Sequence, residues 1–319
     1  VYAADSSMTN PSTPPSNASR GFTIALISAL ILSTTAIFIR YLTETYQMPA
    51  LVLAFWRDFL VALTLLPILL VVRPHLLRVG RSHLAYLLSY GLLLAVFNGV
   101  WTLSVALNGA AISTLLVYSS AAFTALLGWW LLKEGLNWAK LLAIVLSLGG
   151  CVLVSGALGS QAASISMMGI LIGILSGLAW AVYTLMGRSA SQRGLNPWTT
   201  LLYTFGFAAV FLLVFNLLPF QSLPGKAANP AELFWLGSAL SGWLILFLLA
   251  AGPTLAGFGL YNVSLSYLPS SVVNLIVTLE PVMTALLAYF LLGETMTSVQ
   301  IGGGLLILMG VVCLRLFGE

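Results

Sequence analysis

Three ionisable residues lie inside long apolar segments of the sequence. Arg57 and Asp58 fall in the segment 50–72, and Glu280 falls in the segment 270–292. A charge at the centre of a bilayer costs at least about 2.5–3.5 kcal/mol on insertion scales, so such residues are candidates for function. Glu280 could bind an amine, carry a proton, or bond to a neighbouring helix while neutral. A structural role in packing explains it equally well.

Arg57 and Asp58 are adjacent, and their side chains should therefore diverge on a helix. They stand in the outer third of their segment, where a long side chain can reach the membrane surface. This position favours a structural role for the pair, and the alternative for Arg57 is an outer gate or a site for a substrate carboxylate. Pro281 follows Glu280 and leaves the carbonyl of Val277 without its helical partner, so a gating or structural role is predicted for Pro281 as well.

Polar and aromatic residues share faces on four of the predicted helices, because they recur at helical spacing. A cavity for an amino acid needs amide and hydroxyl groups for the charged ends and aromatic walls for the side chain. The predicted substrate-binding residues are Asn98, Trp101, Thr114, Tyr118, Ser176, Trp180, Tyr183, Asn274 and Thr278. The simpler explanation is that Asn and Thr bridge helices while Trp and Tyr pack or lie in interfacial belts. Trp101 and Trp180 are the strongest candidates, because both lie within spans and share faces with polar groups.

Enzyme chemistry finds no support in the sequence. The two histidines, His75 and His83, lie in or beside one loop, and the two cysteines, Cys151 and Cys313, lie in apolar segments near opposite leaflets. No Cys/His cluster with metal-ligand spacing and no Gly-rich phosphate loop is present. The sequence therefore predicts a protein that is not an enzyme and has no metal and no cofactor.

The amino-acid composition predicts that these apolar segments lie in a lipid bilayer. Of the 319 residues, 60% are hydrophobic and 6% are charged, and the mean hydropathy is +1.05. A soluble domain carries roughly 25% charged residues. The sequence predicts an all-α, polytopic membrane protein, preceded by a disordered tail over residues 1–20. Its ten spans are 21–43, 50–72, 82–107, 110–132, 138–157, 167–188, 197–220, 234–267, 270–292 and 298–317. The eighth exceeds one span and contains Gly252-Pro253, so it should bend or begin with an interfacial helix.

The distribution of Lys and Arg predicts the orientation. With the N-terminus in the cytoplasm, nine of these residues lie inside and only Arg40 and Lys226 lie outside, while Arg57 is within a span. The nine are Arg20, Arg73, Arg78, Arg81, Lys133, Lys140, Arg188, Arg193 and Arg315. Both termini are predicted to be cytoplasmic. The net charge of +4 reflects this asymmetry rather than nucleic-acid binding, because no Lys/Arg run is dense enough for a phosphate backbone.

The two halves of the chain resemble each other. Residues 21–40 align without gaps with 169–188, and the run FTALLGWWLLKE at 123–134 aligns with MTALLAYFLLGE at 283–294. Each copy, 21–157 and 167–317, holds five spans, so the second copy must be inverted. Inverted repeats are typical of secondary transporters with a site near the midplane.

Small residues recur on the same faces of the repeats. Those at 169, 173 and 177, with their counterparts at 21, 25 and 29, predict tight packing within each half. The glycines at 302, 303, 304 and 310 are predicted to pack within the molecule rather than against another subunit.

These features together resemble the drug/metabolite transporter superfamily, in its ten-helix branch of paired EamA-type repeats. The resemblance covers roughly 21–317 and rests on Phe55-Trp56-Arg57, the hairpin 101–134 and its mate 261–294, Glu280-Pro281, the Leu-Leu-Gly-Glu ending at 294, Gln300 and Gly302. Within the superfamily the chain is similar to bacterial aromatic amino acid exporters. The resemblance implies an inner-membrane exporter whose spans 1–4 and 6–9 surround a central cavity, with spans 5 and 10 at the periphery.

The sequence thus predicts a secondary transporter that exports small amphipathic metabolites, amino acids and aromatic ones included, by alternating access. The alternative is an exporter of hydrophobic cations or drugs on the same fold, which an acidic Glu280 would favour. The expected partners are a small-molecule substrate and the lipid bilayer, with no nucleic acid. The oligomeric state is left open by the sequence, and a monomer is compatible with it.

Overall fold

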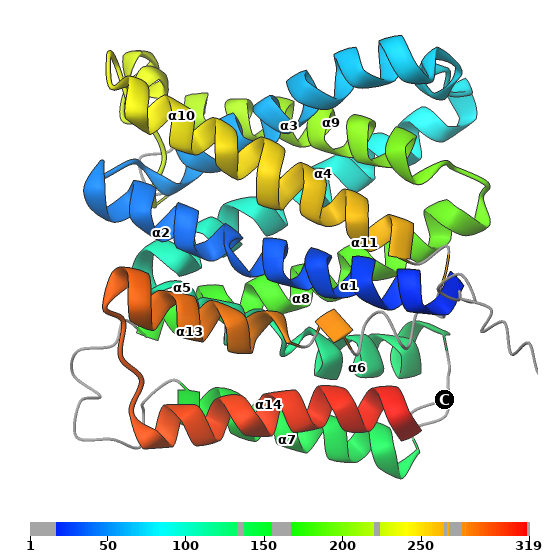
Figure 1. Cartoon of the computed structure of the whole chain (residues 1–319), viewed down its shortest axis with the longest axis vertical. Coiled ribbons are helices and arrows are strands. Elements are labelled where there is room, and N and C mark those ends of the chain that lie inside the picture. The colour runs from blue at the N-terminus through cyan, green and yellow to red at the C-terminus, as the bar shows by residue number, and fades with distance from the viewer. Residues whose placement is uncertain are drawn as a thin grey trace, which may run out of the picture.

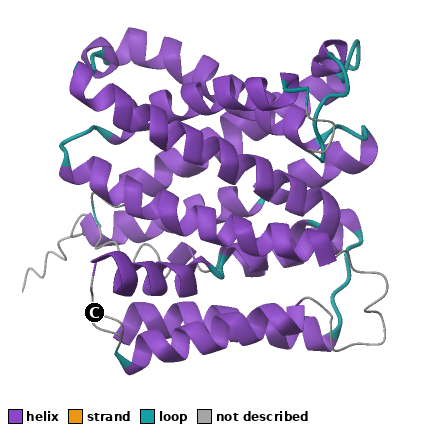
Figure 2. Ribbon diagram, turned by 180° about the vertical axis from the view of Figure 1, so that it is seen from behind, coloured by secondary structure: helices purple, strands orange, loops and turns teal. Residues whose placement is uncertain are grey.

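The structure is a computed structural model, and it describes residues 17–132, 137–154, 167–219, 224–264, 267, 276–277 and 279–317. Every regular element in these ranges is a helix, and most helices run roughly alongside one another (Figures 1 and 2). Six helical stretches are long and apolar enough to cross a bilayer, and four shorter apolar helices fall in the other predicted spans. The predicted all-α, polytopic fold is therefore confirmed.

The first span is interrupted. Helix α1 (Asn17–Ser33) and helix α2 (Thr35–Thr45) are separated by the single residue Thr34. The hydroxyls of Ser33, Thr34 and Thr35 each donate to the backbone carbonyl three residues earlier, at 2.7 Å. Such bonds compete with the helical ladder and bend the helix. Residues 17–20 of the predicted disordered tail belong to α1, and residues 1–16 lie outside the described ranges.

The next three spans bring one departure from the predicted helices. Helix α3 (Ala50–Val72), the 3₁₀ turn η1 (Pro74–Leu77) and α4 (Arg81–Asn108) agree with the prediction. The fourth span divides into α5 (Ala110–Val117) and α6 (Ser120–Leu132). The amides of Tyr118 and Ser119 there bond to carbonyls three residues back. The hydropathy that predicts the span 110–132 reports burial and not whether each amide keeps its helical partner, so it does not reveal this division.

Spans five to seven are α7 (Trp138–Val154), α8 (Met167–Gln192) and α9 (Pro197–Leu217). The start of α9 shows why a predicted break occurs where it does. The Asn196 side chain accepts a hydrogen bond from the Trp198 amide at 2.9 Å, and Pro197 occupies the first turn. Asn at the cap and Pro at the first helical position is a strong helix start.

The eighth span is irregular, as predicted. It follows a 3₁₀ helix η3 (Pro230–Phe234) and consists of α10 (Leu240–Leu249), the π-helical η4 (Ala250–Gly257) and α11 (Phe258–Ser264). Pro253 removes a backbone donor inside η4. The Thr254 hydroxyl donates to the Leu249 carbonyl at 2.9 Å. The prediction was a bend or an interfacial helix at the start of the span; the structure has a π-helical stretch around Pro253 and a short 3₁₀ helix just before the span.

The last two spans end in α13 (Glu280–Leu292) and α14 (Ser298–Phe317). Gly293, with a φ of 67°, terminates α13 in the left-handed conformation that glycine tolerates. Most of the ninth span before Glu280 lies outside the described residues.

Matching helices of the two repeats run in opposite directions. In Figure 1 the chain passes from α5 at the left to α6 further right, whereas α13 ends at the left, where it leads into α14. The beginning of α1 and the end of α14 both lie at the right. This arrangement agrees with an inverted copy of a five-span unit.

The small-residue face of α8 packs across the boundary between the repeats. A Cβ at Gly173 would lie 2.5 Å from the Leu116 side chain, and one at Gly177 would collide with the Ser119 hydroxyl. Leu116 and Ser119 belong to the first repeat, so the prediction that this face packs within its own half was wrong. Small residues at this boundary let α8 approach α4 and α5 closely.

Helices α7 and α14 pair along one edge of the bundle (Figures 1 and 2). A Cβ at Gly303 would lie 2.7 Å from the carbonyl oxygen of Gly150, and one at Gly310 would lie 2.9 Å from the Ser147 hydroxyl. Gly304 faces Leu115 of α5 in the same way, at 2.9 Å. Packing within the molecule is thus observed for three of the four glycines. Gly302 has no described atom within 4 Å of its would-be Cβ.

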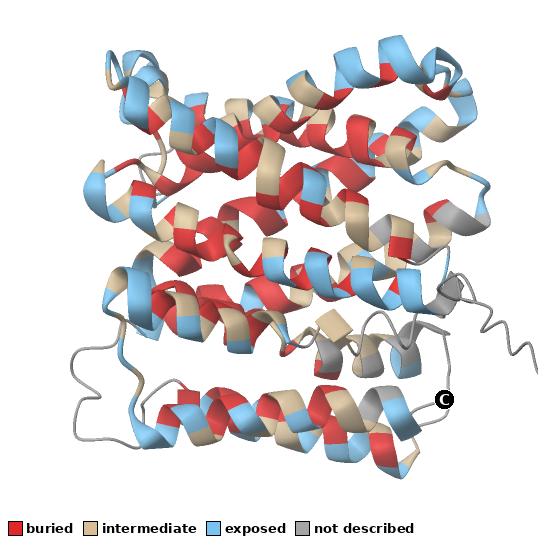
Figure 3. Ribbon diagram, in the orientation of Figure 1, coloured by how far each residue is buried: buried red, intermediate tan, exposed pale blue. Residues whose placement is uncertain are grey.

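Buried positions concentrate where the helices face one another inside the bundle (Figure 3). Large apolar side chains cover much of the outside, and examples are Val145 on α7 and Phe290 on α13, with 67% and 76% of their surface exposed. Soluble monomeric proteins rarely expose so large an apolar surface to water. Such a surface is compatible with contact with lipid, and in helices the backbone N–H and C=O groups are hydrogen-bonded internally, as a bilayer requires.

Candidate binding cavity

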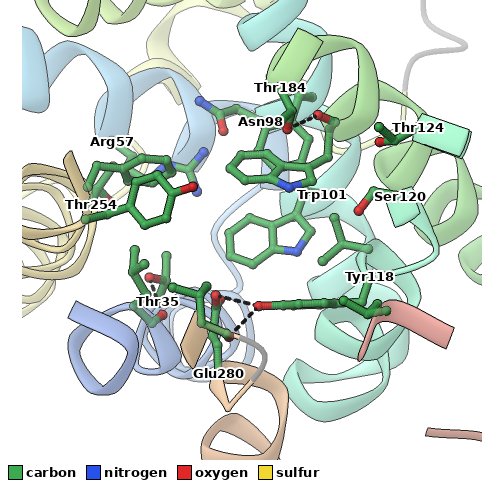
Figure 4. Close-up of a pocket in the computed structure, with 18 of the residues that line it drawn as sticks. Thr35, Arg57, Asn98, Trp101, Tyr118, Ser120, Thr124, Thr184, Thr254 and Glu280 are labelled. Atoms are coloured by element: carbon green, nitrogen blue, oxygen red, sulfur yellow. Dashed lines mark hydrogen bonds between the residues drawn. The ribbon is translucent and has the colours of Figure 1, made fainter. Parts of the chain in front are cut away.

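A cavity of about 330 Å³ lies inside the bundle (Figure 4). Spans one to four and six to nine all contribute to its wall, and Val311 of α14 is an addition to that expected set. The remaining lining residues are Leu32, Thr35, Arg57, Phe97, Asn98, Trp101, Val117, Tyr118, Ser120, Thr124, Trp180, Thr184, Phe205, Thr254, Phe258, Tyr261, Val277 and Glu280. The wall is mostly apolar and aromatic with a few polar groups, which is the usual make-up of a small-molecule site.

Arg57 and Asp58 form a buried cluster with Asn98. Only 2% of Arg57 and 0% of Asp58 is exposed. The Asn98 amide donates to both carboxylate oxygens of Asp58, at 2.8 and 2.7 Å, and Nε of Arg57 lies 3.4 Å from Asp58 Oδ1. Two sequence predictions were wrong here: the neighbouring side chains converge instead of diverging, and neither reaches the membrane surface. A charge that far from water is tolerated when it is paired and hydrogen-bonded, and this cluster provides both.

Aromatic rings form a continuous part of the cavity wall. Phe97 lies 5.0 Å from Trp180 and 6.3 Å from Trp101, measured between ring centroids. The Arg57 guanidinium carbon stands 5.7 Å from the centroid of the Trp101 ring, within the range of a cation–π contact. Nε1 of Trp101 is buried and has no hydrogen-bond partner among the described residues.

Glu280 faces the cavity beside Tyr118. The Tyr118 hydroxyl lies 3.1 Å from Glu280 Oε2 and 2.9 Å from the backbone carbonyl oxygen of Val277, so its single proton serves one or both acceptors (Figure 4). Pro281 cannot donate to Val277, and the Tyr118 hydroxyl takes the place of that missing amide. No ion pair joins Glu280 to a cation within the part of the chain that the structure describes.

The structure therefore gathers five of the predicted residues, Asn98, Trp101, Tyr118, Trp180 and Glu280, together with Arg57, around one cavity. Four others do not line this cavity: Thr114, Ser176, Tyr183 and Pro281. Ser176 donates to the Gly173 carbonyl of its own helix at 2.6 Å. The Tyr183 ring stacks on Trp180 with 5.3 Å between centroids. Pro281 contributes instead to a second, largely apolar pocket beside α14. Asn274 and Thr278 lie outside the described residues.

Several lining residues were missed by reasoning from helix faces, although the repeat alignment could have found them. The offset of 160 that relates the two hairpins pairs Trp101 with Tyr261 and Ser120 with Glu280. Both members of each pair line the cavity. Phe258 is likewise the counterpart of Asn98. Matching positions of an inverted repeat meet at a site near the pseudo-twofold axis. A candidate site residue in one copy therefore predicts that the aligned residue of the other copy also lines the site.

A second polar cluster lies at the end of the bundle opposite the beginning of α1 and the end of α14 (Figure 1). Arg40 of α2 donates to the Ala106 carbonyl at 2.6 Å and pairs with Glu44 at 2.5 Å and with Glu294 at 3.5 Å. Glu294 accepts hydrogen bonds from the amides of Ala110 and Ala111, at 2.8 and 3.1 Å. A carboxylate at the start of α5 is stabilised by the helix dipole and satisfies two amides that have no partner within the helix. The cluster joins α2, α4, α5 and the end of α13.

Comparison with known proteins identifies a family and several proteins that this chain resembles. Residues 19–156 and 167–316 each match the model of the EamA-like transporter family. A probable amino-acid metabolite efflux pump of Salmonella typhimurium is 28% identical over 86% of this chain and 87% of that protein. A threonine/homoserine exporter, RhtA, of the same species is 25% identical over 72% of this chain and 70% of that protein. A protein of known crystal structure superposes with a TM-score of 0.59 over 92% of this chain and 96% of the other, at 18% identity, which shows a shared fold.

Proposed function

Because this chain belongs to the EamA-like transporter family, and is thus a membrane transporter and not an enzyme, we propose that it exports amino acids, aromatic ones included, by alternating access. The cavity is the observation that carries this proposal. Its volume of about 330 Å³ is near the lower end of the roughly 300–1,000 Å³ that small-molecule sites occupy. A cavity of that size suits one amino acid better than a large drug.

The chemistry of the wall supports the same substrate class. Trp101, Trp180 and Phe97 offer rings to an apolar side chain, while Arg57 and Glu280 offer one charge of each sign. Relatives named as an amino-acid metabolite efflux pump and a threonine/homoserine exporter agree with this proposal. The location is proposed to be the bacterial inner membrane with both termini in the cytoplasm, on the strength of the Lys/Arg asymmetry.

Reconstituted protein tests the proposal. Liposomes that contain the purified chain should release or take up radiolabelled phenylalanine or tryptophan faster than empty liposomes. The second candidate function, export of hydrophobic cations, is favoured by Glu280 alone. Flux of an aromatic cation without any amino acid flux would therefore replace the first proposal with the second.

Two further measurements refine the transport model. Trp101→Ala and Trp180→Ala should each raise the substrate concentration at half-maximal flux, because each removes part of the aromatic wall. If both variants fold and keep wild-type flux kinetics, the cavity is not the substrate site. In a series of imposed pH gradients, Glu280→Gln should abolish any pH dependence if Glu280 carries the coupled proton, and wild-type pH dependence in this variant would exclude that role.

A further inference from the structure

Arg57 has hydrogen-bonding capacity that the protein does not use. Its Nη2 is buried, and no side chain or carbonyl of the described residues accepts from it. A buried donor that is left without an acceptor is costly, and the cost is greater for a charged group. A guanidinium presents its donors in a planar fork that matches a carboxylate. Arg57 also lines the cavity, so a bound anion can reach it.

Asp58 does not satisfy this guanidinium. Both of its carboxylate oxygens accept from Asn98, at 2.8 and 2.7 Å. Its contact with Arg57 is longer, 3.4 Å, and uses only Nε. Asp58 therefore balances the charge of Arg57 from behind, while the outer part of the guanidinium remains directed along the cavity wall beside the Trp101 ring (Figure 4).

Glu280 lies across the cavity from Arg57 (Figure 4). Its described polar neighbour is the Tyr118 hydroxyl, which acts as a donor to it. An ammonium group with three donors is a suitable partner for a carboxylate in that position. The aromatic side chains of Trp101 and Trp180 line the same cavity.

We propose that the cavity recognises a zwitterion by its two ends, with Arg57 binding the substrate carboxylate and Glu280 binding its ammonium group. This proposal rests on the proposed function and names the feature that the substrates share. Side chains of different size then occupy the aromatic part of the wall, whereas the charged ends keep one orientation. Molecules with only one of the two charges satisfy only one side of the site.

The wild-type protein provides the first test, in competition against radiolabelled phenylalanine flux. Phenethylamine lacks the carboxylate, and 3-phenyllactate lacks the ammonium group. Unlabelled phenylalanine should compete at least about tenfold better than either analogue, a factor that corresponds to about 1.4 kcal/mol at 25 °C. If phenethylamine competes as well as phenylalanine, the proposed role of Arg57 is wrong. Equal competition by 3-phenyllactate would remove the role of Glu280.

Variants assign each end to its residue. Arg57→Met should weaken competition by phenylalanine and 3-phenyllactate at least about tenfold and leave phenethylamine unchanged. Glu280→Gln should weaken phenylalanine and phenethylamine and leave 3-phenyllactate unchanged. Arg193→Met is the matched control, because Arg193 stands over the Tyr86 ring at the end of α8 and does not line the cavity. It should keep the wild-type order of the three compounds.

The outcomes separate this inference from the function on which it rests. Phenylalanine flux with equal competition by all three compounds would refute zwitterion recognition and leave amino acid export standing. Absence of flux of any amino acid, together with phenethylamine flux, would refute amino acid export itself. Should Arg57→Met fail to fold, the wild-type competition still decides the question.

Discussion

Alanine at Gly303 and alanine at Gly302 should have opposite effects on stability, although the two residues are adjacent in α14. A Cβ at Gly303 would lie 2.7 Å from the Gly150 carbonyl oxygen, 2.7 Å from Leu153 Cβ and 2.8 Å from the Val154 amide nitrogen. Two of these atoms are backbone and cannot move alone, so α7 and α14 must separate. Reaching an ordinary contact of 3.4 Å requires a shift of about 0.7 Å, and a gap of that size forfeits roughly a quarter to a half of the dispersion energy of the facing atoms.

The magnitude follows from these contacts. Overpacking of this kind costs about 1–3 kcal/mol, and at Gly303 this cost opposes the gain in helix propensity that alanine brings. At Gly302 no described atom lies within 4 Å of the new Cβ, and Ala is favoured over Gly in a helix interior by about 0.8–1.0 kcal/mol. Both glycines lie in the interior of α14, so the gain in helix propensity cancels and the two variants should differ by the overpacking cost, about 1–3 kcal/mol.

Unfolding of both variants in the same detergent, followed by circular dichroism against temperature and against denaturant, measures this difference. The midpoint of Gly303→Ala should fall below that of the wild type, and that of Gly302→Ala should match or exceed it. Equal midpoints, or the reverse order, would show that the close approach of α7 and α14 does not determine the stability of the pair.

Three further variants test the polar clusters by thermal unfolding and transport. Glu294→Gln should destabilise the protein by about 1 kcal/mol, because one amide oxygen cannot replace a carboxylate that caps two amides; an unchanged midpoint would contradict this capping role. Asn98→Leu should cost about 1–3 kcal/mol by removing both donors to buried Asp58 and should slow transport, whereas wild-type stability would refute the cluster. Gly109→Ala should cost about 1–3 kcal/mol, because Gly109 has a φ of 85° and its Cβ would meet the Glu294 side chain at 2.7 Å, and a neutral result would contradict that geometry.

The spans and the repeat could be predicted from the sequence, because both depend on local patterns. α3 covers residues 50–72 as expected, and the Asn196-Pro197 start of α9 follows from capping chemistry. Breaks inside spans could not be predicted in this way. Ser33, Thr34 and Thr35 are compatible with an unbroken helix, and only their hydroxyl bonds to the preceding turn show where α1 ends. A break inside an apolar segment changes hydrogen bonding without changing hydropathy.

The charged cluster shows a different limit. Adjacent side chains on an ideal helix diverge by about 100°. The prediction that the side chains of Arg57 and Asp58 point apart came from this rule. Asn98 on another helix overrides it, because its amide holds both oxygens of Asp58. Such a partner comes from another helix, so it depends on tertiary packing. Residue spacing within one segment cannot predict it.

The repeat explains where the cavity lies, and departures from the repeat explain why the chemistry of its wall is unequal. Trp101 and Tyr261 occupy matching positions and are both aromatic, so the two halves supply similar apolar walls. The charged positions are not matched: the counterpart of Glu280 is Ser120. Charge is thus placed unequally about the pseudo-twofold axis, and under the zwitterion proposal a substrate that has distinct ends would take one preferred orientation. An inverted pair of halves can exchange conformations while the polarity of the site between them stays fixed.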